Sequence, residues 1–172
     1  MTRESRPAIA VAVADLQTSM VLSPGRLRRA VRAALAGPSA GKAAGRPAGG
    51  RPGAKARISL AVVDDPVIAR LNRQFLHHRG ATDVLSFVLE RRPGWLEAEI
   101  VVSAETARRE ARHYGARPQD ELLLYVVHGA LHLAGYDDRS AGGRARMWAR
   151  QRTVMAELGV KQKDEGGRMK DE

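Results

Sequence analysis

Residues 127–140 read V-H-G-A-L-H-L-A-G-Y-D-D-R-S, and this stretch decides both how the chain can fold and what it can bind. His128 and His132 are four residues apart, which places both imidazoles on one face of a helix. Gly135 then allows the chain to leave the helix, so that Asp138 can fold back toward the histidines. Three protein ligands leave a fourth position for water, which is typical of a catalytic zinc site.

The alternative interpretation is structural. Either histidine could be a core residue with ordinary hydrogen bonds, and the pair Asp137–Asp138 could belong to a solvated loop. However, the surrounding segment 122–134 is otherwise apolar, and two histidines buried in it need polar partners. One metal ion would satisfy both. The pattern therefore favours a metal-dependent hydrolase.

Length and composition favour one cytoplasmic domain. The chain has 172 residues, enough for a single hydrophobic core, and it contains no run of 18 apolar residues that would predict a membrane span. It has no cysteine, which excludes disulfides, thiolate metal sites and cysteine nucleophiles and fits a reducing compartment. The apolar start at 8–14 is interrupted by Asp15 and reads as a first strand more readily than as a signal peptide.

The net charge of +10 is concentrated in the first third of the chain. Residues 1–57 hold 11 Lys and Arg against 2 Asp and Glu, whereas residues 58–172 hold 18 against 17. A basic segment of this kind predicts a polyanion partner, and nucleic acid is the natural one. The alternative is a basic but merely solvated segment.

The periodicity of the sequence predicts an α+β fold. We expect one domain over 1–160, built on a small mixed β-sheet of about four strands, with helices packed mainly on one face and the metal-binding helix at the centre. The predicted strands are 8–16, 58–63, 82–89 and 99–102, and the predicted helices are 24–35, 65–76, 104–114, 119–134 and 141–158. Residues 37–56 are rich in Gly, Ala, Pro and basic residues and predict a flexible insertion; residues 161–172 predict a charged, disordered tail.

Several motifs in register resemble one known family. The segment from His128 to Asp137, H-G-A-L-H-L-A-G-Y-D, resembles the signature H-G-x-L-H-L-x-G-Y-D-H of the YbeY family, bacterial endoribonucleases also called rRNA maturation factors. The motifs L-N at 71–72, T-D-V-L-S-F at 82–87, E-I-V-V-S-A-E-T-A at 99–107 and E-L at 121–122 follow the family's order and spacing. The resemblance covers about residues 58–158.

The resemblance implies a zinc enzyme that cleaves single-stranded RNA. It further implies a role in maturing the 3′ end of small-subunit ribosomal RNA and in ribosome quality control, with the ribosome or its proteins as partners. Its metal ligands would be His128, His132 and Asp138, the last standing where the family usually has a third histidine. A carboxylate in that place makes the metal a weaker Lewis acid and also suits manganese or iron.

Two positions need separate interpretation, one beside the predicted third ligand and one where the chain departs from the family pattern. Asp137 is a rival third ligand; we expect it instead to orient the loop or a histidine. Many members of the family carry an arginine after the aromatic residue that precedes T-D-V-L-S-F, but here Phe75 is followed by Leu76. Arg79 could supply that charge, or it could be an ordinary solvated loop residue.

The resulting hypothesis is phosphodiester cleavage by a metal-activated water, with arginines stabilising the developing charge. The candidate substrate contacts are Arg79, Arg139 and Ser86, with Thr82 and the arginines 108, 109 and 112 as further candidates. Attack by the RNA 2′-hydroxyl remains an open alternative. We expect a monomer, because nothing in the sequence indicates otherwise.

Two rival functions follow from the same residues. A metallopeptidase with this ligand spacing needs a glutamate directly after the first histidine, and here that residue is Gly129. A non-catalytic, zinc-containing ribosome-assembly factor is the stronger rival, since the missing arginine after Phe75 and the aspartate in place of the third histidine both favour it.

Overall fold

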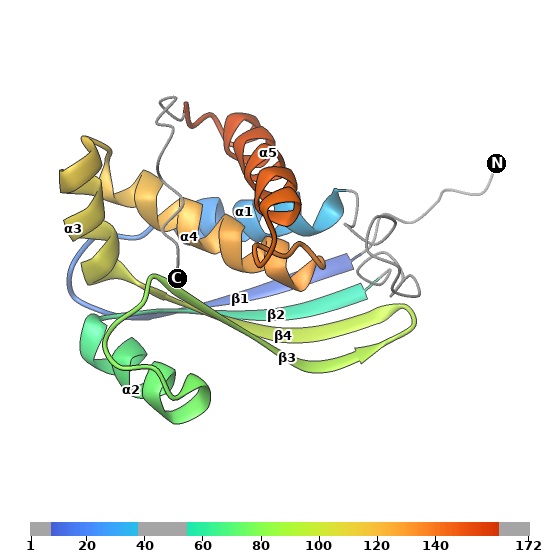
Figure 1. The fold of residues 1–172 in the computed structure, drawn as a ribbon, viewed down its shortest axis with the longest axis horizontal. Helices are drawn as coiled ribbons and strands as arrows, with labels where there is room; N and C mark the ends of the chain where they lie inside the picture. Colours follow the sequence, from blue (N-terminus) through green and yellow to red (C-terminus); the bar gives the residue numbers. More distant parts are fainter. Residues whose placement is uncertain (1–7, 38–54, 162–172) are drawn as a thin grey trace.

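The computed structural model describes residues 8–37 and 55–161 of the chain (Figure 1). Most of the predicted flexible insertion, residues 38–54, and the predicted tail from residue 162 onward lie outside the described residues. Across the described ranges, none of the helices combines the length and the apolar character that crossing a membrane requires.

Four strands of residues 8–37 and 55–161 form one mixed sheet, as predicted. They are β1 (Ala8–Leu16), β2 (Lys55–Val63), β3 (Val84–Arg92) and β4 (Trp95–Ser103), in the spatial order β1-β2-β4-β3. β1 pairs with β2 and β2 pairs with β4 in parallel, and β3 pairs with β4 antiparallel as a hairpin. The sheet therefore has β1 and β3 as its two edges.

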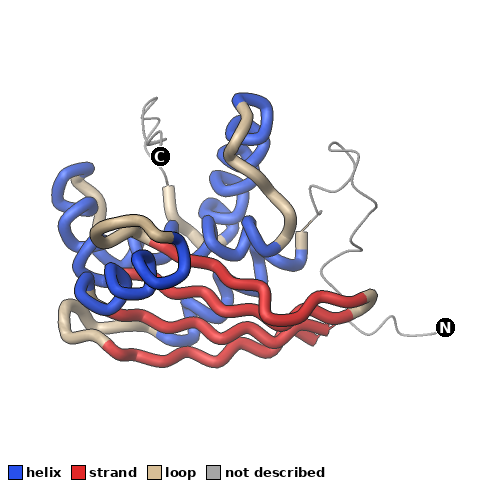
Figure 2. The backbone as a smooth tube through the Cα atoms, turned by 60° about the horizontal axis from the view of Figure 1, so that its bottom comes forward, coloured by secondary structure: helices blue, strands red, loops and turns tan. Residues whose placement is uncertain are grey.

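Within the described ranges, five helices cover the sheet unequally. They are α1 (Pro24–Ala36), α2 (Asp65–Leu76), α3 (Ala104–Tyr114), α4 (Pro118–Leu133) and α5 (Ala141–Glu157). Figures 1 and 2 show α2 alone on one face, whereas α1, α4 and α5 lie on the other with α3 beside α4. The predicted α+β architecture, with helices mainly on one face, is confirmed.

Two strands begin earlier than the sequence patterns indicated. β2 begins at Lys55, ahead of the predicted residue 58, because Ala56 continues the alternation of buried side chains through Ile58 and Leu60. β4 begins at Trp95, where the turn at Gly94 (φ 75°) pairs it with β3. A short apolar run marks the buried centre of a strand more clearly than its paired ends.

The core is divided by the sheet into a large and a small part. The large part lies under α1, α4 and α5, and α4 contributes buried residues from all round its circumference. The small part lies under α2, where Ile68 packs with Val63, Leu85 and Val101. The central position predicted for the histidine-bearing helix is therefore confirmed, because α4 is in contact with the sheet, α1, α3 and α5.

Helix α4 approaches the sheet most closely at Gly129. A Cβ atom added there would lie 2.8 Å from Cγ2 of Val84, 2.9 Å from Oγ of Ser86 and 3.1 Å from Cγ2 of Ile100. The Ser86 hydroxyl also donates a hydrogen bond of 3.0 Å to the Gly129 carbonyl. The glycine between the histidines is therefore needed for packing α4 against β3 and β4.

We predict that Gly129→Ala lowers the free energy of unfolding by about 1–3 kcal/mol, because the methyl group overpacks this contact. Urea denaturation followed by circular dichroism measures it. Gly25→Ala is the matched control, since Gly25 also lies in a helix but a Cβ there meets nothing within 4 Å. Equal stability of Gly129→Ala and the unmodified chain would contradict this account of the packing.

Candidate metal centre

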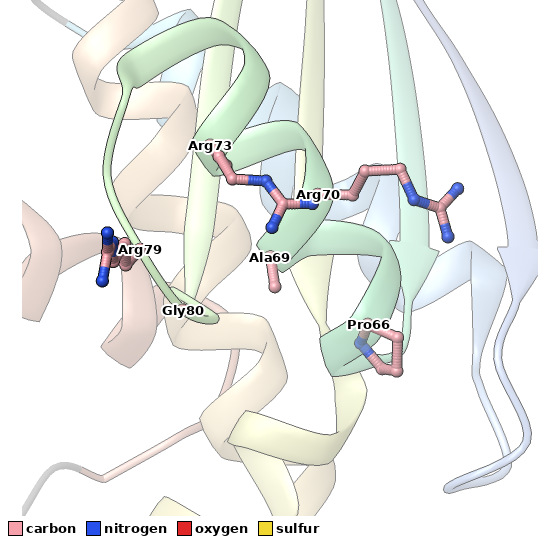
Figure 3. A pocket seen from close by; sticks show the side chains of 6 residues that line it. All are labelled: Pro66, Ala69, Arg70, Arg73, Arg79 and Gly80. Carbon is pink, nitrogen blue, oxygen red and sulfur yellow. The ribbon is translucent and has the colours of Figure 1, made fainter.

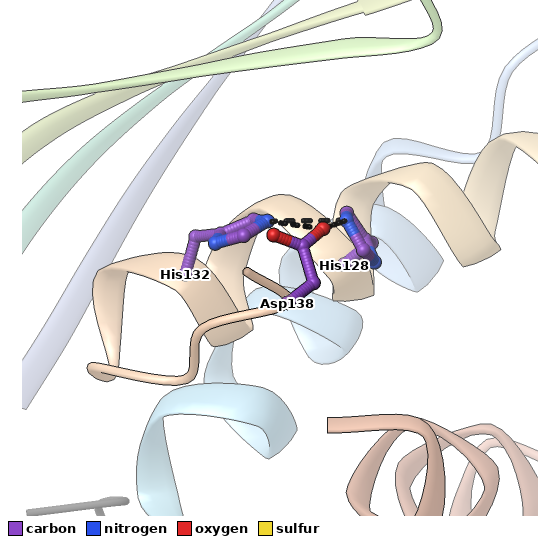
Figure 4. Close-up of side chains that lie close together, drawn as sticks. All are labelled: His128, His132 and Asp138. Atoms are coloured by element: carbon purple, nitrogen blue, oxygen red, sulfur yellow. Dashed lines mark hydrogen bonds and ion pairs between the residues drawn. The ribbon is translucent and has the colours of Figure 1, made fainter. Parts of the chain in front are cut away.

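Three side chains come together where α4 ends and the following loop turns back. His128 and His132 project from one face of α4, and Asp138 reaches them from the loop between α4 and α5 (Figure 4). Their ligand atoms all lie within 4.8 Å of one another. The structure thus brings together the three residues that the sequence singled out, in a group that could hold a metal ion.

The distances within this group fit a single small cation. The two Nε2 atoms are 3.1 Å apart, and Oδ2 of Asp138 lies 3.7 Å from each of them. A tetrahedral zinc ion with bonds of about 2.0–2.2 Å separates its ligand atoms by about 3.3–3.6 Å. The observed separations lie on either side of this range, so small adjustments suffice. All three side chains are between 31% and 45% exposed, which leaves an open side for water or substrate.

A buried amide fixes the orientation of the first imidazole. Gln151 of α5 is only 6% exposed, and its Oε1 lies 3.0 Å from Nδ1 of His128. An amide oxygen accepts hydrogen bonds, so this contact keeps the proton on Nδ1 and leaves the Nε2 lone pair facing His132 and Asp138. Orientation of a metal-binding histidine through its other ring nitrogen is the usual arrangement in metal sites.

The surroundings of His132 favour its neutral form. Burial lowers the pKa of His132 and the neighbouring His128 lowers it further, while Asp138 and a backbone hydrogen bond with Tyr136 act in the opposite direction. The net shift is downward, so the ring is neutral near pH 7. Neutral imidazole is the form that coordinates metals.

Asp137 is bonded to Arg139 and does not belong to this group. Its Oδ1 accepts a hydrogen bond of 2.7 Å from the backbone N–H of Arg139, and its Oδ2 lies 3.2 Å from Nε of the same arginine. That backbone hydrogen bond, more than the nearby charge, lowers the pKa of Asp137. The carboxylate therefore holds the turn and the Arg139 side chain, and Asp138 is the acid that faces the histidines.

The loop that carries Asp138 is fixed at both ends. At its start Gly135 has a φ of 94°, and the N–H of Tyr136 donates to the carbonyl of Leu131, which closes α4. At its end the Ser140 hydroxyl accepts from the N–H of Gly143 and caps α5. The exit at Gly135 that the sequence predicted is therefore present.

The other predicted substrate contacts lie in different surroundings. Ser86 faces α4 but uses its hydroxyl on the Gly129 carbonyl, and Thr82 donates to Asp83 at the start of β3. Arg139 is paired with Asp137, although its side chain is 86% exposed. Arg79 lies in the loop after α2, and Leu76 is exposed at the end of that helix. None of these four predicted contacts, which are Ser86, Thr82, Arg139 and Arg79, belongs to the ligand group itself.

Much of the positive charge of α1 and α3 is used inside the fold. Arg28 and Arg32 donate to the carbonyls of Val11 and Ile9 on the outer edge of β1, and Arg26 pairs with Asp120. On α3, Arg108 donates to the Ser19 carbonyl and Arg109 pairs with Asp65. These five arginines therefore have partners within the described fold, and the basic residues 42, 46 and 51 lie outside the described residues.

Gln151 is the residue of this centre that the sequence did not reveal. It lies 23 residues after His128, and a glutamine on a helix is ordinarily a solvated residue. Only the crossing of α5 over α4 places its amide against the imidazole. The apolar pattern assigns the buried face of α5 to Met147, Val154 and Met155. The one sequence signal for a buried polar contact is that Gln151 lies on this same face.

We predict that Gln151→Ala lowers the affinity for a divalent metal by about 10–100-fold, the usual cost of losing a partner that orients a histidine. Competition with a chromophoric chelator measures the affinity. Gln151→Glu is the control, because it keeps an acceptor oxygen and should retain tight binding. A thermal melt shows whether each variant is folded. Metal affinity unchanged in folded Gln151→Ala would show that the contact has no influence on the site.

Comparison with known proteins adds an independent finding. The family model described as Endoribonuclease YbeY matches residues 47–159. A protein named Endoribonuclease YbeY from Rhodopirellula baltica is 41% identical over 108 residues, which are 62% of this chain and 56% of that protein. The Moorella thermoacetica protein of the same name is 42% identical over 118 residues, or 62% of this chain and 76% of that protein.

The fold is also similar to that of a solved structure. The solution structure of a Thermotoga maritima protein matches 90% of this chain and 100% of its own chain with a TM-score of 0.51 at 24% identity. That likeness concerns the fold alone. This chain spans only 56% of the length of the Rhodopirellula baltica relative. Since the family model covers more than half of the chain and the histidine-bearing segment lies within the match, the chain belongs to the Endoribonuclease YbeY family.

Proposed function

We propose that this chain is a zinc-dependent endoribonuclease that hydrolyses single-stranded RNA. The observation that carries the proposal is the ligand group, in which two imidazole nitrogens and one carboxylate oxygen lie 3.1–3.7 Å apart. The relatives' name, Endoribonuclease YbeY, supports the substrate class. Maturation of ribosomal RNA, including the small-subunit 3′ end, and a part in ribosome quality control are the cellular roles we propose.

Zinc is the metal that fits the donor set best. Two neutral imidazoles and one carboxylate are a common zinc set, and three protein ligands leave a position open for the reaction. When bound, such an ion lowers the pKa of a coordinated water and polarises a phosphoryl oxygen. The carboxylate of Asp138 also suits manganese or iron, which a metal-replacement assay would separate from zinc.

The chain's own residues prepare the centre for this chemistry. Gln151 holds the proton of His128 on Nδ1, and burial keeps His132 neutral, so both Nε2 atoms are free to bind a cation. Arg139 directly follows Asp138, and its side chain is exposed. An ion pair with Asp137 holds the Arg139 guanidinium beside the loop. Its guanidinium is the nearest cation along the chain that could stabilise charge developing on a phosphate.

A peptidase activity conflicts with the packing of α4. A metallopeptidase of this ligand spacing requires a glutamate in the position of Gly129 as its general base. Any side chain there would meet Val84, Ser86 and Ile100 of the sheet. The position is therefore closed to a catalytic carboxylate, which favours phosphodiester over peptide hydrolysis.

A non-catalytic role in ribosome assembly is the second candidate. The observation that favours it is Leu76, a side chain that is 46% exposed. Many members of the family that this chain resembles have an arginine at this position. In both cases we propose ribosomal RNA and ribosomal proteins as partners, a monomeric state and a cytoplasmic location. The absence of cysteine fits that compartment.

We predict that His132→Ala and Asp138→Ala each lower the rate of RNA cleavage by more than about 100-fold. Loss of a residue that only orients a metal ligand usually costs about 10–100-fold, and loss of a ligand itself should cost more. Cleavage of a labelled single-stranded RNA by folded, identically purified proteins measures the rate. Asp137→Ala is the matched control: its carboxylate binds Arg139 and is not part of the ligand group, so it should lose much less metal affinity and activity than either ligand variant. Clean unmodified protein that binds metal without cleaving RNA would favour the assembly factor.

A further inference from the structure

A basic pocket lies on the opposite face of the sheet from α4. It has a volume of about 570 Å³, and its walls are formed by α2 on one side and by the loop that follows α2 on the other (Figure 3). We call it the α2 pocket; its lining residues are Pro66, Ala69, Arg70, Arg73, Arg79 and Gly80. Three of the six are arginines and none is acidic, so the pocket is suited to an anion.

The three arginines differ from the five paired arginines of α1 and α3, because no carboxylate or carbonyl of the described fold pairs with them. No carboxylate of residues 8–37 or 55–161 lies within 4.0 Å of Arg70, Arg73 or Arg79. All three are exposed. Figure 3 shows Arg73 nearer to the loop of Arg79, while the Arg70 side chain extends away from it. A bound anion would neutralise positive charge that no carboxylate of the described residues neutralises. Their donors are therefore available to a ligand.

The wall formed by the loop is held in place by a buried residue of α2. Asn72 is only 6% exposed, and its Nδ2 donates a hydrogen bond of 3.1 Å to the carbonyl of Gly80. The carbonyl of Asn72 accepts from the N–H of His78, and His77 adopts a left-handed conformation (φ 56°) that ends the helix. Arg79 is thus kept opposite Arg70 and Arg73 before any ligand binds.

The same loop connects the pocket to the metal centre. Beyond Gly80 the chain enters β3, and Ser86 contacts the carbonyl of Gly129, which directly follows His128. Ser86 is six residues beyond Gly80, so the Cα atoms of these two residues are at most about 20 Å apart. One single strand of RNA that passes the β3 edge can therefore reach both places.

We propose that the α2 pocket binds a backbone phosphate of the RNA, several nucleotides from the bond that is cleaved. This inference rests on the proposed function and adds a second contact on the substrate. Guanidinium groups match the geometry of phosphate oxygens and donate paired hydrogen bonds to them. A contact of this kind positions the strand without reading its sequence.

The test is the salt dependence of RNA binding, measured by fluorescence anisotropy with a labelled single-stranded RNA. All proteins carry His132→Ala, so that cleavage does not interfere. Arg73→Ala should weaken binding and reduce the slope of log K against log salt by about 0.7, the contribution of one phosphate contact to a single strand. Arg29→Ala is the matched control: Arg29 is an exposed helical arginine outside the pocket, and its loss changes the net charge equally.

Two further outcomes separate the inference from the proposed function. Inorganic phosphate should compete with RNA more strongly in the parent protein than in Arg73→Ala. Equal slopes for Arg73→Ala and Arg29→Ala, or phosphate binding in the pocket that leaves RNA binding unchanged, would overturn the inference while cleavage by the unmodified chain stands. If the unmodified chain neither binds nor cleaves RNA, the proposed function fails first and the pocket's role with it.

Discussion

The contact between Gly129 and the sheet is the constraint on which the rest of the structure depends. Helix α4 is buried nearly all round, yet it must present two histidines to an open side. Close packing at Gly129 fixes the rotation of the helix against β3 and β4, and that rotation decides where His128 and His132 point. The ligand group is thus a consequence of core packing, since rigid elements hold functional side chains more precisely than loops do.

The elements that could be predicted are those with a local cause. The histidine spacing and the turn at Gly135 depend on neighbours along the chain, and both are present in the structure. Gln151 could not be predicted, because its role depends on how α5 crosses α4. The ends of β2 and β4 were also missed, since pairing with a neighbouring strand extends them.

The positive charge of the chain could be counted from the sequence but not assigned. The sequence does not distinguish one arginine from another. In the fold, some arginines bind backbone carbonyls or carboxylates, whereas others face solvent. Arg28 and Arg32 cover the free edge of β1, while Arg70 and Arg73 stand free beside a pocket on α2. The charge that remains for a polyanion in the described fold therefore includes a site outside the basic first third.

The most direct test of the account is the position of zinc in crystals, located by anomalous scattering at the zinc edge. The account predicts one ion per chain, about 2.0–2.2 Å from Nε2 of His128, Nε2 of His132 and Oδ2 of Asp138. An ion held by Asp137, or zinc bound elsewhere while these three atoms remain without it, would contradict the assignment of this group as the metal centre.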